Sequence, residues 1–144
     1  SKAFGLAGLR IGAMTGHPDT LEPVRLLIPV YSVNIAAIVA VQAALADLEF
    51  VERYKAEVET SKGLLYAACD RLGLRYWKSA ANFVLIDAGT RAPALARGAA
   101  ARGIYIRDRS REAGLEGGQR VGAGIVAHTT RCIEVFEEVL CAAE

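Results

Sequence analysis

The longest regular pattern of apolar positions lies in residues 34–72, where apolar side chains recur mostly every three or four positions, as on one face of a helix. Asn34 is a favourable N-cap and Gly73 is a favourable residue just beyond a helix end, so the pattern predicts a helix over 34–72. Gly63 costs about 1 kcal/mol relative to alanine in mid-helix, and we expect a bend or break near it. Such length is typical of a helix that connects two domains.

The segments on either side of this helix have different patterns. Residues 74–144 alternate short apolar runs with helical periodicity, which predicts a compact α/β unit of the α+β type. The predicted strands are Leu74–Lys78, Ala81–Asp87, Ile104–Arg107 and Gln119–Ala123, and the predicted helices are Ala92–Arg102 and Thr129–Ala142. Residues 1–33 are punctuated by glycine and proline and predict a short strand at 9–14 and a short helix at 21–27. The predicted organisation is therefore 1–33, 34–73 and 74–144.

Composition and charge narrow the class of protein. Hydrophobic residues make up 53% and charged residues 23% of the 144 residues, with 17 Lys plus Arg against 16 Asp plus Glu. This composition excludes intrinsic disorder as the main state and argues against nucleic acid or an anionic membrane as partner. Three cysteines without a CxxC pair favour a reducing, cytoplasmic setting, and no apolar run reaches the ~20 residues of a membrane span. Small anions remain possible ligands.

The first twelve residues combine an amine, a hydroxyl and a guanidinium in a glycine-rich apolar setting. Lys2 follows Ser1, and Arg10 comes eight residues later. An amine among apolar side chains loses its proton more easily and becomes a nucleophile towards carbonyls, and a guanidinium anchors a phosphate or carboxylate. The alternative from residue types alone is a surface lysine and an ion-paired arginine.

This stretch, Ser1-Lys2-Ala3-Phe4-Gly5-Leu6-Ala7-Gly8-Leu9-Arg10, resembles the cofactor-lysine motif of fold-type I pyridoxal-phosphate aminotransferases, and most closely that of histidinol-phosphate aminotransferases. The resemblance implies that Lys2 forms the Schiff base with pyridoxal 5'-phosphate and moves the substrate's α-proton. It also implies that Ser1 and Arg10 bind the cofactor phosphate. We expect no metal ion in this site.

The resemblance continues along the chain. Residues 28–34 are similar to the family's Pro-Tyr-x-Val-Asn segment ahead of the interdomain helix, and residues 81–85 to the first strand of its small domain. Residues 102–108 are similar to the Arg-Gly-Ile-x-Val-Arg-Asp segment, and Gln119-Arg120-Val121 to the strand whose arginine grips the substrate's acidic group. Arg120 would then bind that group, with Arg107 assisting. The alternative for both arginines is a surface ion pair.

The resemblance also implies a domain role for each part of the chain, an activity and an oligomeric state. Residues 1–33 would end the cofactor-binding large domain, 34–73 would be the interdomain helix and 74–144 the small domain of a PLP-transferase. The activity would be transamination between a small-molecule amino donor, histidinol phosphate, and a 2-oxo acid, 2-oxoglutarate, in histidine biosynthesis. The enzyme would be a cytoplasmic homodimer. Aromatic amino acids and threonine phosphate are alternative substrates, because related enzymes share the pattern.

Two features depart from the family. Its hydroxyl residue and Gly-Thr after the arginine strand are replaced by Gly122-Ala123-Gly124-Ile125, which we expect to loosen the backbone around Arg120. The acidic partner of the cofactor nitrogen, which makes the ring an electron sink, comes in the family from sequence upstream of the lysine. We therefore expect no efficient transamination by these 144 residues alone. The alternatives are a non-catalytic fragment or interaction module, or an anion-binding module that uses Arg107, Arg109 and Arg120.

Three other patterns favour structural interpretations. Residues 122–127 match the G-x-G-x-x-G/A dinucleotide fingerprint, but the acidic strand that should follow is missing. His128 and Cys132 share one helix face, yet a structural zinc needs four ligands, so we expect an exposed histidine and a buried cysteine. The 34–72 helix lacks sustained heptads, which favours packing within the protein over a coiled coil.

Overall fold

The structure is a computed structural model that describes residues 2–141. The chain forms two compact units, residues 1–53 and 54–144. Unit 1 holds a 3₁₀ turn η1 (Ala7–Leu9), helix α1 (Pro18–Arg25), helix α2 (Ile35–Ala46) and the start of helix α3 (Leu48–Arg71). The strand expected at residues 9–14 does not form. A strand needs a neighbour for its backbone N–H and C=O groups, and the described part of unit 1 contains no other strand.

The segment expected as one helix is two helices. α2 ends at Ala46, Asp47 has φ −111° and ψ 67°, and α3 begins at Leu48. The Asp47 carboxylate accepts a hydrogen bond from the Phe50 N–H (3.1 Å) and so caps the new helix. The expected break near Gly63 is wrong, because α3 runs through it without interruption. An aspartate side chain that hydrogen-bonds backbone N–H groups favours a cap, whereas a single glycine in mid-helix is tolerated at a cost of about 1 kcal/mol.

Helix α2 is apolar all round, since Gln42 is its one polar residue. Helices of this kind are typical of the interior of a large protein. In unit 1, however, Ala37 is the one buried residue of α2, and Ile35 and Val39 are 75% and 61% exposed.

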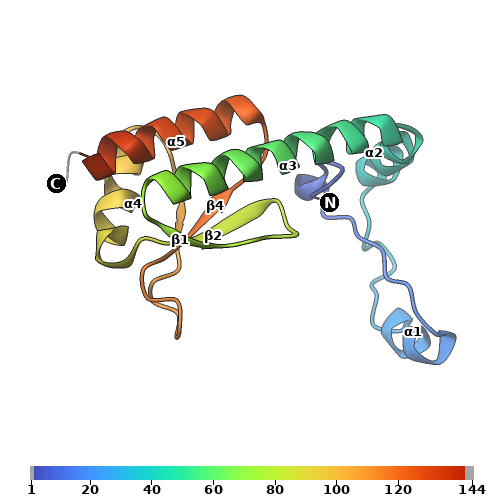
Figure 1. Cartoon of the computed structure of the whole chain (residues 1–144). Coiled ribbons are helices and arrows are strands. Elements are labelled where there is room, and N and C mark those ends of the chain that lie inside the picture. The colour runs from blue at the N-terminus through green and yellow to red at the C-terminus, as the bar shows by residue number, and fades with distance from the viewer. Residues whose placement is uncertain (1, 142–144) are drawn as a thin grey trace. The chain divides into compact units, whose positions relative to one another are not determined.

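Unit 2 is a four-stranded antiparallel sheet covered on one face by helices, as Figure 1 shows. The strand order is β1 (Arg75–Trp77), β2 (Phe83–Asp87), β4 (Gly118–Gly122) and β3 (Arg107–Asp108). The helices are residues 54–71 of α3, α4 (Ala92–Ala101) and α5 (Val126–Cys141), and a 3₁₀ turn η2 (Gly89–Arg91) precedes α4. The mixed α/β class expected from the sequence is confirmed.

The core of unit 2 lies between the sheet and these helices. Val84, Ile86 and Val121 point from the sheet towards Leu65 and Phe136, and all five are at most 2% exposed. Alternate residues of β2 and β4 therefore face the helices, and the residues between them lie on the opposite, more open face.

Helices α4 and α5 approach closely at Gly98. A Cβ atom at Gly98 would lie 2.6 Å from a methyl carbon of Val139. The absence of a side chain at this position therefore sets the distance between the two helices.

The expected strand Ile104–Arg107 is shorter and shifted in the structure, where β3 comprises Arg107 and Asp108 alone. Ile104, Tyr105 and Ile106 instead border a cavity beside the end of β4. The start of this strand was predicted wrongly because apolar pattern does not tell a paired strand from an extended cavity wall.

Candidate active site

The two cationic residues near the start of unit 1, Lys2 and Arg10, are exposed. Lys2 lies in a turn in which its carbonyl accepts a hydrogen bond from the Gly5 N–H at 3.3 Å. Arg10 follows η1 with φ 54° and ψ 38°, and is the one non-glycine residue with positive φ in the described chain. A left-handed backbone at a residue with a side chain costs about 1 kcal/mol or more and is enriched at functional sites. Ser1, the other expected phosphate ligand, lies outside the described residues.

Asn34 ties this segment to helix α2. Its Oδ1 accepts a hydrogen bond from the Ala37 N–H (2.8 Å), which confirms the expected N-cap, and its Nδ2 donates to the Leu9 carbonyl at 3.1 Å. The second contact was not expected from the sequence, because a cap pattern carries no information on what the other half of the amide binds. The tether fixes the backbone immediately before Arg10.

An apolar cavity of about 390 Å³ lies beside the same segment within unit 1. It is lined by Phe4, Leu6, Ile11, Gly12, Ala13, Val41 and Leu45. Phe4 and Leu6, which lie between Lys2 and Arg10, thus share this cavity with Val41 and Leu45 of α2, while both cationic residues are exposed.

In unit 2 the sheet brings the two expected substrate arginines together. Arg107 of β3 pairs in register with Arg120 of β4, so both side chains leave the same face of the sheet. Neither forms an ion pair with another residue of the described range 2–141. The Arg120 guanidinium carbon lies 5.1 Å from the centre of the Phe83 ring, a cation–π contact that aligns it along the sheet.

The register of Arg107 and Arg120 places two positively charged residues opposite each other on neighbouring strands. Like charges placed directly opposite on neighbouring strands destabilise a sheet. A bound phosphate or carboxylate removes the repulsion and gains charge-assisted hydrogen bonds from both guanidinium groups. The backbone register therefore makes the pair a candidate anion site, and the surface ion pairs considered as the alternative are absent from the described residues.

The turn after β4 is anchored rather than loose, so the expected loosening around Arg120 is wrong. The fully buried Ser61 donates its hydroxyl hydrogen to the Gly124 carbonyl at 2.7 Å. The Val126 N–H donates to Glu57 Oε1 at 3.1 Å. The Ala123 N–H donates to the Asn82 carbonyl at 2.9 Å. Helix α3 thus supplies two of the three hydrogen bonds that hold this turn. Sequence spacing gave no signal for Ser61 or Glu57, because tertiary contact alone brings them to the turn.

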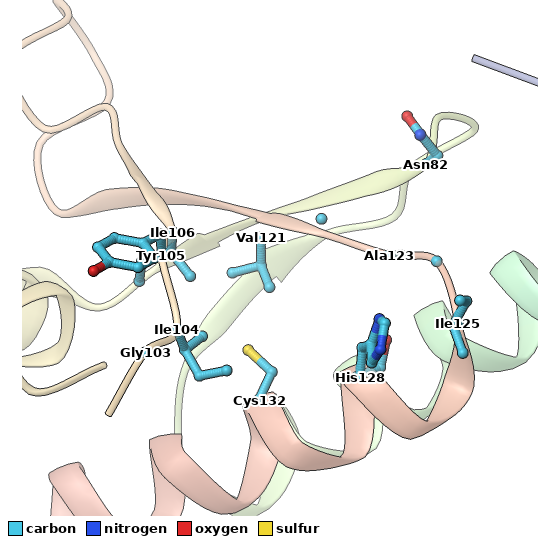
Figure 2. Close-up of a pocket in the computed structure, with 13 residues that line it drawn as sticks. Asn82, Gly103, Ile104, Tyr105, Ile106, Val121, Ala123, Ile125, His128 and Cys132 are labelled. Carbon is cyan, nitrogen blue, oxygen red and sulfur yellow. The ribbon is translucent and has the colours of Figure 1, made fainter. Parts of the chain in front are cut away.

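A second cavity of about 390 Å³ lies between residues 103–106, the end of β4 and the first turns of α5, as Figure 2 shows. His128 is exposed there and Cys132 is buried, as expected. Burial raises the pKa of the Cys132 thiol to about 12, so it stays protonated at neutral pH. The described residues contain no group of three or more side chains suited to a metal ion.

The dinucleotide interpretation of residues 122–127 does not fit the sheet. β4 is followed by a turn and a helix, but it pairs antiparallel with both β2 and β3. The fingerprint belongs to parallel βαβ units, in which the helix N-terminus meets the pyrophosphate.

Comparison with known proteins places this arrangement in a family. The family model "Aminotransferase class I and II" matches residues 1–131. The chain therefore belongs to the class I and II aminotransferase family.

Its relatives name a particular activity. A histidinol-phosphate aminotransferase of Symbiobacterium thermophilum is 39% identical over 97% of this chain. The solved histidinol-phosphate aminotransferase of Sinorhizobium meliloti, in complex with pyridoxal-5'-phosphate, superposes with a TM-score of 0.88 at 27% identity over 99% of the chain. L-threonine-O-3-phosphate decarboxylase of Porphyromonas gingivalis superposes over 96% of it with a TM-score of 0.75 at 25% identity. The chain spans 38%, 39% and 44% of these three proteins, respectively.

None of the described helices is both long enough and apolar enough to cross a bilayer.

Proposed function

We propose that this chain contributes to a pyridoxal-phosphate-dependent aminotransferase that exchanges an amino group between histidinol phosphate and 2-oxoglutarate. The family match and the names of its relatives support this proposal. The observation that carries it is the pair of opposed arginines, Arg107 and Arg120, neither of which is paired with a carboxylate of the described chain. Both substrates bear an anionic group away from the reacting carbon, and one arginine pair serves both.

The residues of unit 1 fit pyridoxal 5'-phosphate by the chemistry of their donors. Lys2 offers a primary amine and Arg10 a guanidinium, and neither forms an ion pair with another residue in the described range. The cofactor supplies an electron sink for the bonds at the substrate's α-carbon. Lys2 would hold the cofactor through Nζ, and its free amine would take up the substrate's α-proton. Arg10 and Ser1 hold the cofactor phosphate, and Arg107 with Arg120 fixes the far end of the substrate.

The domain roles are also part of this proposal. Residues 1–33 end the cofactor-binding domain, residues 34–73 form the interdomain segment with its break at Asp47, and residues 74–144 form the small domain. We further propose a cytoplasmic homodimer, as in the family that the sequence resembles. The nearly complete exposure of Val30 (90%) and Tyr31 (95%) in unit 1 is consistent with burial of this segment against further protein.

The first experiment asks whether Lys2 captures the cofactor. Purified chain is mixed with pyridoxal phosphate, its visible absorbance is recorded, and the product is reduced with borohydride and mapped by peptide mass. We expect a shifted absorbance band and a label on Lys2 that a Lys2→Ala variant loses. Lys78→Ala is the matched control, because Lys78 is equally exposed but lies in unit 2. Labelling spread over the lysines without a shifted band would overturn the cofactor role and favour a non-catalytic fragment.

The second experiment separates the candidate substrates. Histidinol phosphate, threonine phosphate and an aromatic amino acid are titrated separately while the side-chain N–H signals of Arg107 and Arg120 are followed by NMR. We expect histidinol phosphate to shift both signals and histidinol, which lacks the phosphate, to leave them unchanged. A stronger response to threonine phosphate would favour a decarboxylase-like specificity, which the superposition on the Porphyromonas gingivalis enzyme makes the second candidate.

The anion-binding module with three arginines receives less support. Arg109 forms an ion pair with Glu112, and its backbone N–H donates to the Gly118 carbonyl at 2.9 Å. One end of its guanidinium is therefore paired with a carboxylate, unlike those of Arg107 and Arg120, and the proposed anion site consists of Arg107 and Arg120.

A further inference from the structure

A fully buried amide lies immediately before Arg120. Gln119 is 0% exposed, and its register partners are Ile86 on β2 and Asp108 on β3. Because alternate strand residues face opposite sides, the Gln119 side chain lies on the helix-covered face, whereas Arg120 lies on the open one. An amide in such an apolar layer is costly unless it is hydrogen-bonded, so its partners show what it holds in place.

The amide nitrogen of Gln119 has two partners, the acidic residue next to Arg107 and, at 3.4 Å, the Ser110 hydroxyl, whereas its Oε1 has no partner among the described residues. Gln119 Nε2 donates to Asp108 Oδ1 at 2.9 Å, and the same oxygen accepts the Ser110 N–H at 2.8 Å. The side chain and backbone of Ser110 act first among the groups that hold the pKa of Asp108 below its usual range, and Gln119 adds to them. Asp108 is therefore a carboxylate at neutral pH, with one oxygen held by two N–H donors.

This contact involves the negative charge that is nearest to the arginine pair along the chain. Asp108 directly follows Arg107, so it is the carboxylate nearest to the anion site along the chain, and it is exposed. Despite that proximity it forms no ion pair within 4 Å with any other residue of the described chain. A carboxylate free to rotate around the edge of β3 would compete with a bound anion for the guanidinium of Arg107.

We propose that Gln119 is a positioning residue for the anion site: by holding the Asp108 carboxylate towards the helix-covered face and fixing β3 against β4, it leaves Arg107 and Arg120 free for the phosphate or carboxylate of a substrate. The inference rests on the proposed function, in which this arginine pair binds the substrate anion. It differs from a purely structural role, because it makes the charge of Asp108 the reason that Gln119 matters.

The test measures anion binding by the intact chain, with sulfate as the probe because its charge stays at −2 from pH 5 to pH 8. Sulfate is titrated at constant ionic strength while the side-chain N–H signals of Arg107 and Arg120 are followed by NMR. Gln119→Met keeps the length of the side chain and removes the amide. We expect it to weaken sulfate binding about tenfold, because the released Asp108 carboxylate then competes with sulfate for the Arg107 guanidinium. Fluorescence of Trp77, the single tryptophan, shows that unit 2 remains folded.

The double variant Gln119→Met/Asp108→Asn distinguishes positioning from structural support. Loss of a second contact in a merely structural network would weaken sulfate binding further. If Gln119 acts by restraining the charge of Asp108, removal of that charge restores binding to the native level or above it. The single variant Asp108→Asn is the control, and we expect it to bind sulfate at least as well as the native chain.

Each remaining outcome decides between the two proposals. Native-like binding by a folded Gln119→Met chain would overturn the positioning role and leave the proposed function intact. Absence of binding by the native chain would overturn the substrate role of the arginines and, with it, this inference. If Gln119→Met does not fold, the isosteric Gln119→Glu replaces it. We expect Gln119→Glu to lose sulfate affinity at pH 8, because two carboxylates then face each other, and unchanged affinity would contradict the proposal.

Discussion

Replacement of Arg107 by glutamine should make unit 2 more stable while it removes the anion site. Arg107 and Arg120 are register partners on β3 and β4. Like charges at such positions destabilise a sheet, and we take the magnitude to be that which favourable cross-strand pairs contribute, about 0.2–1 kcal/mol. Arg107 is exposed and forms no ion pair with a described residue, so the substitution costs no contact of that kind. Arg120 is the poorer choice, because its cation–π contact with Phe83 would be lost as well. We expect Arg107→Gln to raise the free energy of unfolding by several tenths of a kcal/mol in dilute chloride.

The assay is urea unfolding followed by Trp77 fluorescence, first in dilute chloride and then with added sulfate. An anion that binds only the folded chain stabilises it by RT ln(1 + [L]/Kd), or about 1.4 kcal/mol at ten times Kd. The native chain should therefore gain this increment in sulfate, whereas Arg107→Gln gains much less, and the order of stability reverses. Screening should also shrink the difference in chloride as chloride concentration rises. An equal gain for both proteins in sulfate, or a destabilised variant in dilute chloride, would refute the reasoning.

Three further predictions concern packing and reactivity. Ser61→Ala should destabilise unit 2 by about 1–3 kcal/mol in urea unfolding, because it leaves the Gly124 carbonyl without its buried donor; an unchanged midpoint would show that the turn does not depend on this bond. Gly98→Ala should cost about 1–2 kcal/mol, since overpacking against Val139 outweighs the gain in helix propensity, and Val139→Ala in the same chain should recover part of that loss in a double-mutant cycle. At pH 8 a thiol reagent should label the exposed Cys141 rapidly and leave Cys132, with its pKa of about 12, unlabelled by mass spectrometry until the chain unfolds. Equal labelling rates would contradict the burial of Cys132.

Local patterns in the sequence predicted individual helices, strands and caps, because these depend on residues that are close together in the chain. The strand at β2, the helix at α5 and the N-cap at Asn34 follow from apolar period and cap chemistry, and the structure confirms all three. The break at Asp47 was missed, because a glycine is a conspicuous helix breaker and a single aspartate among helix formers is not. The strand at 9–14 was predicted from apolar residues without knowledge of a pairing partner, which sequence period cannot supply.

The residues of the candidate site could be named from the sequence, but their spatial arrangement could not be predicted. Lys2, Arg10, Arg107 and Arg120 were singled out from a resemblance that depends on contiguous motifs, and their roles stay proposals. The sequence could not predict the register that places Arg107 opposite Arg120, since it depends on how two strands with nine residues between them align. The Asp-x-Ser sequence at 108–110 carries an Asx-turn signal, and the Asp108–Ser110 contact is of this local kind. Nothing local predicted that Gln119 would reach it.

The strand order of unit 2 has a consequence for how the anion site forms during folding. β4 lies between β2 and β3, yet it is the last strand along the chain and is separated from β2 by helix α4. The β1–β2 pair closes a loop of five residues, whereas the β2–β4 pair must close one of thirty, and contacts of longer sequence separation form more slowly. Arg120 reaches its place only when β4 inserts. In a refolding experiment, recovery of sulfate binding should therefore be the last signal to return, and its rate reports the completion of the sheet.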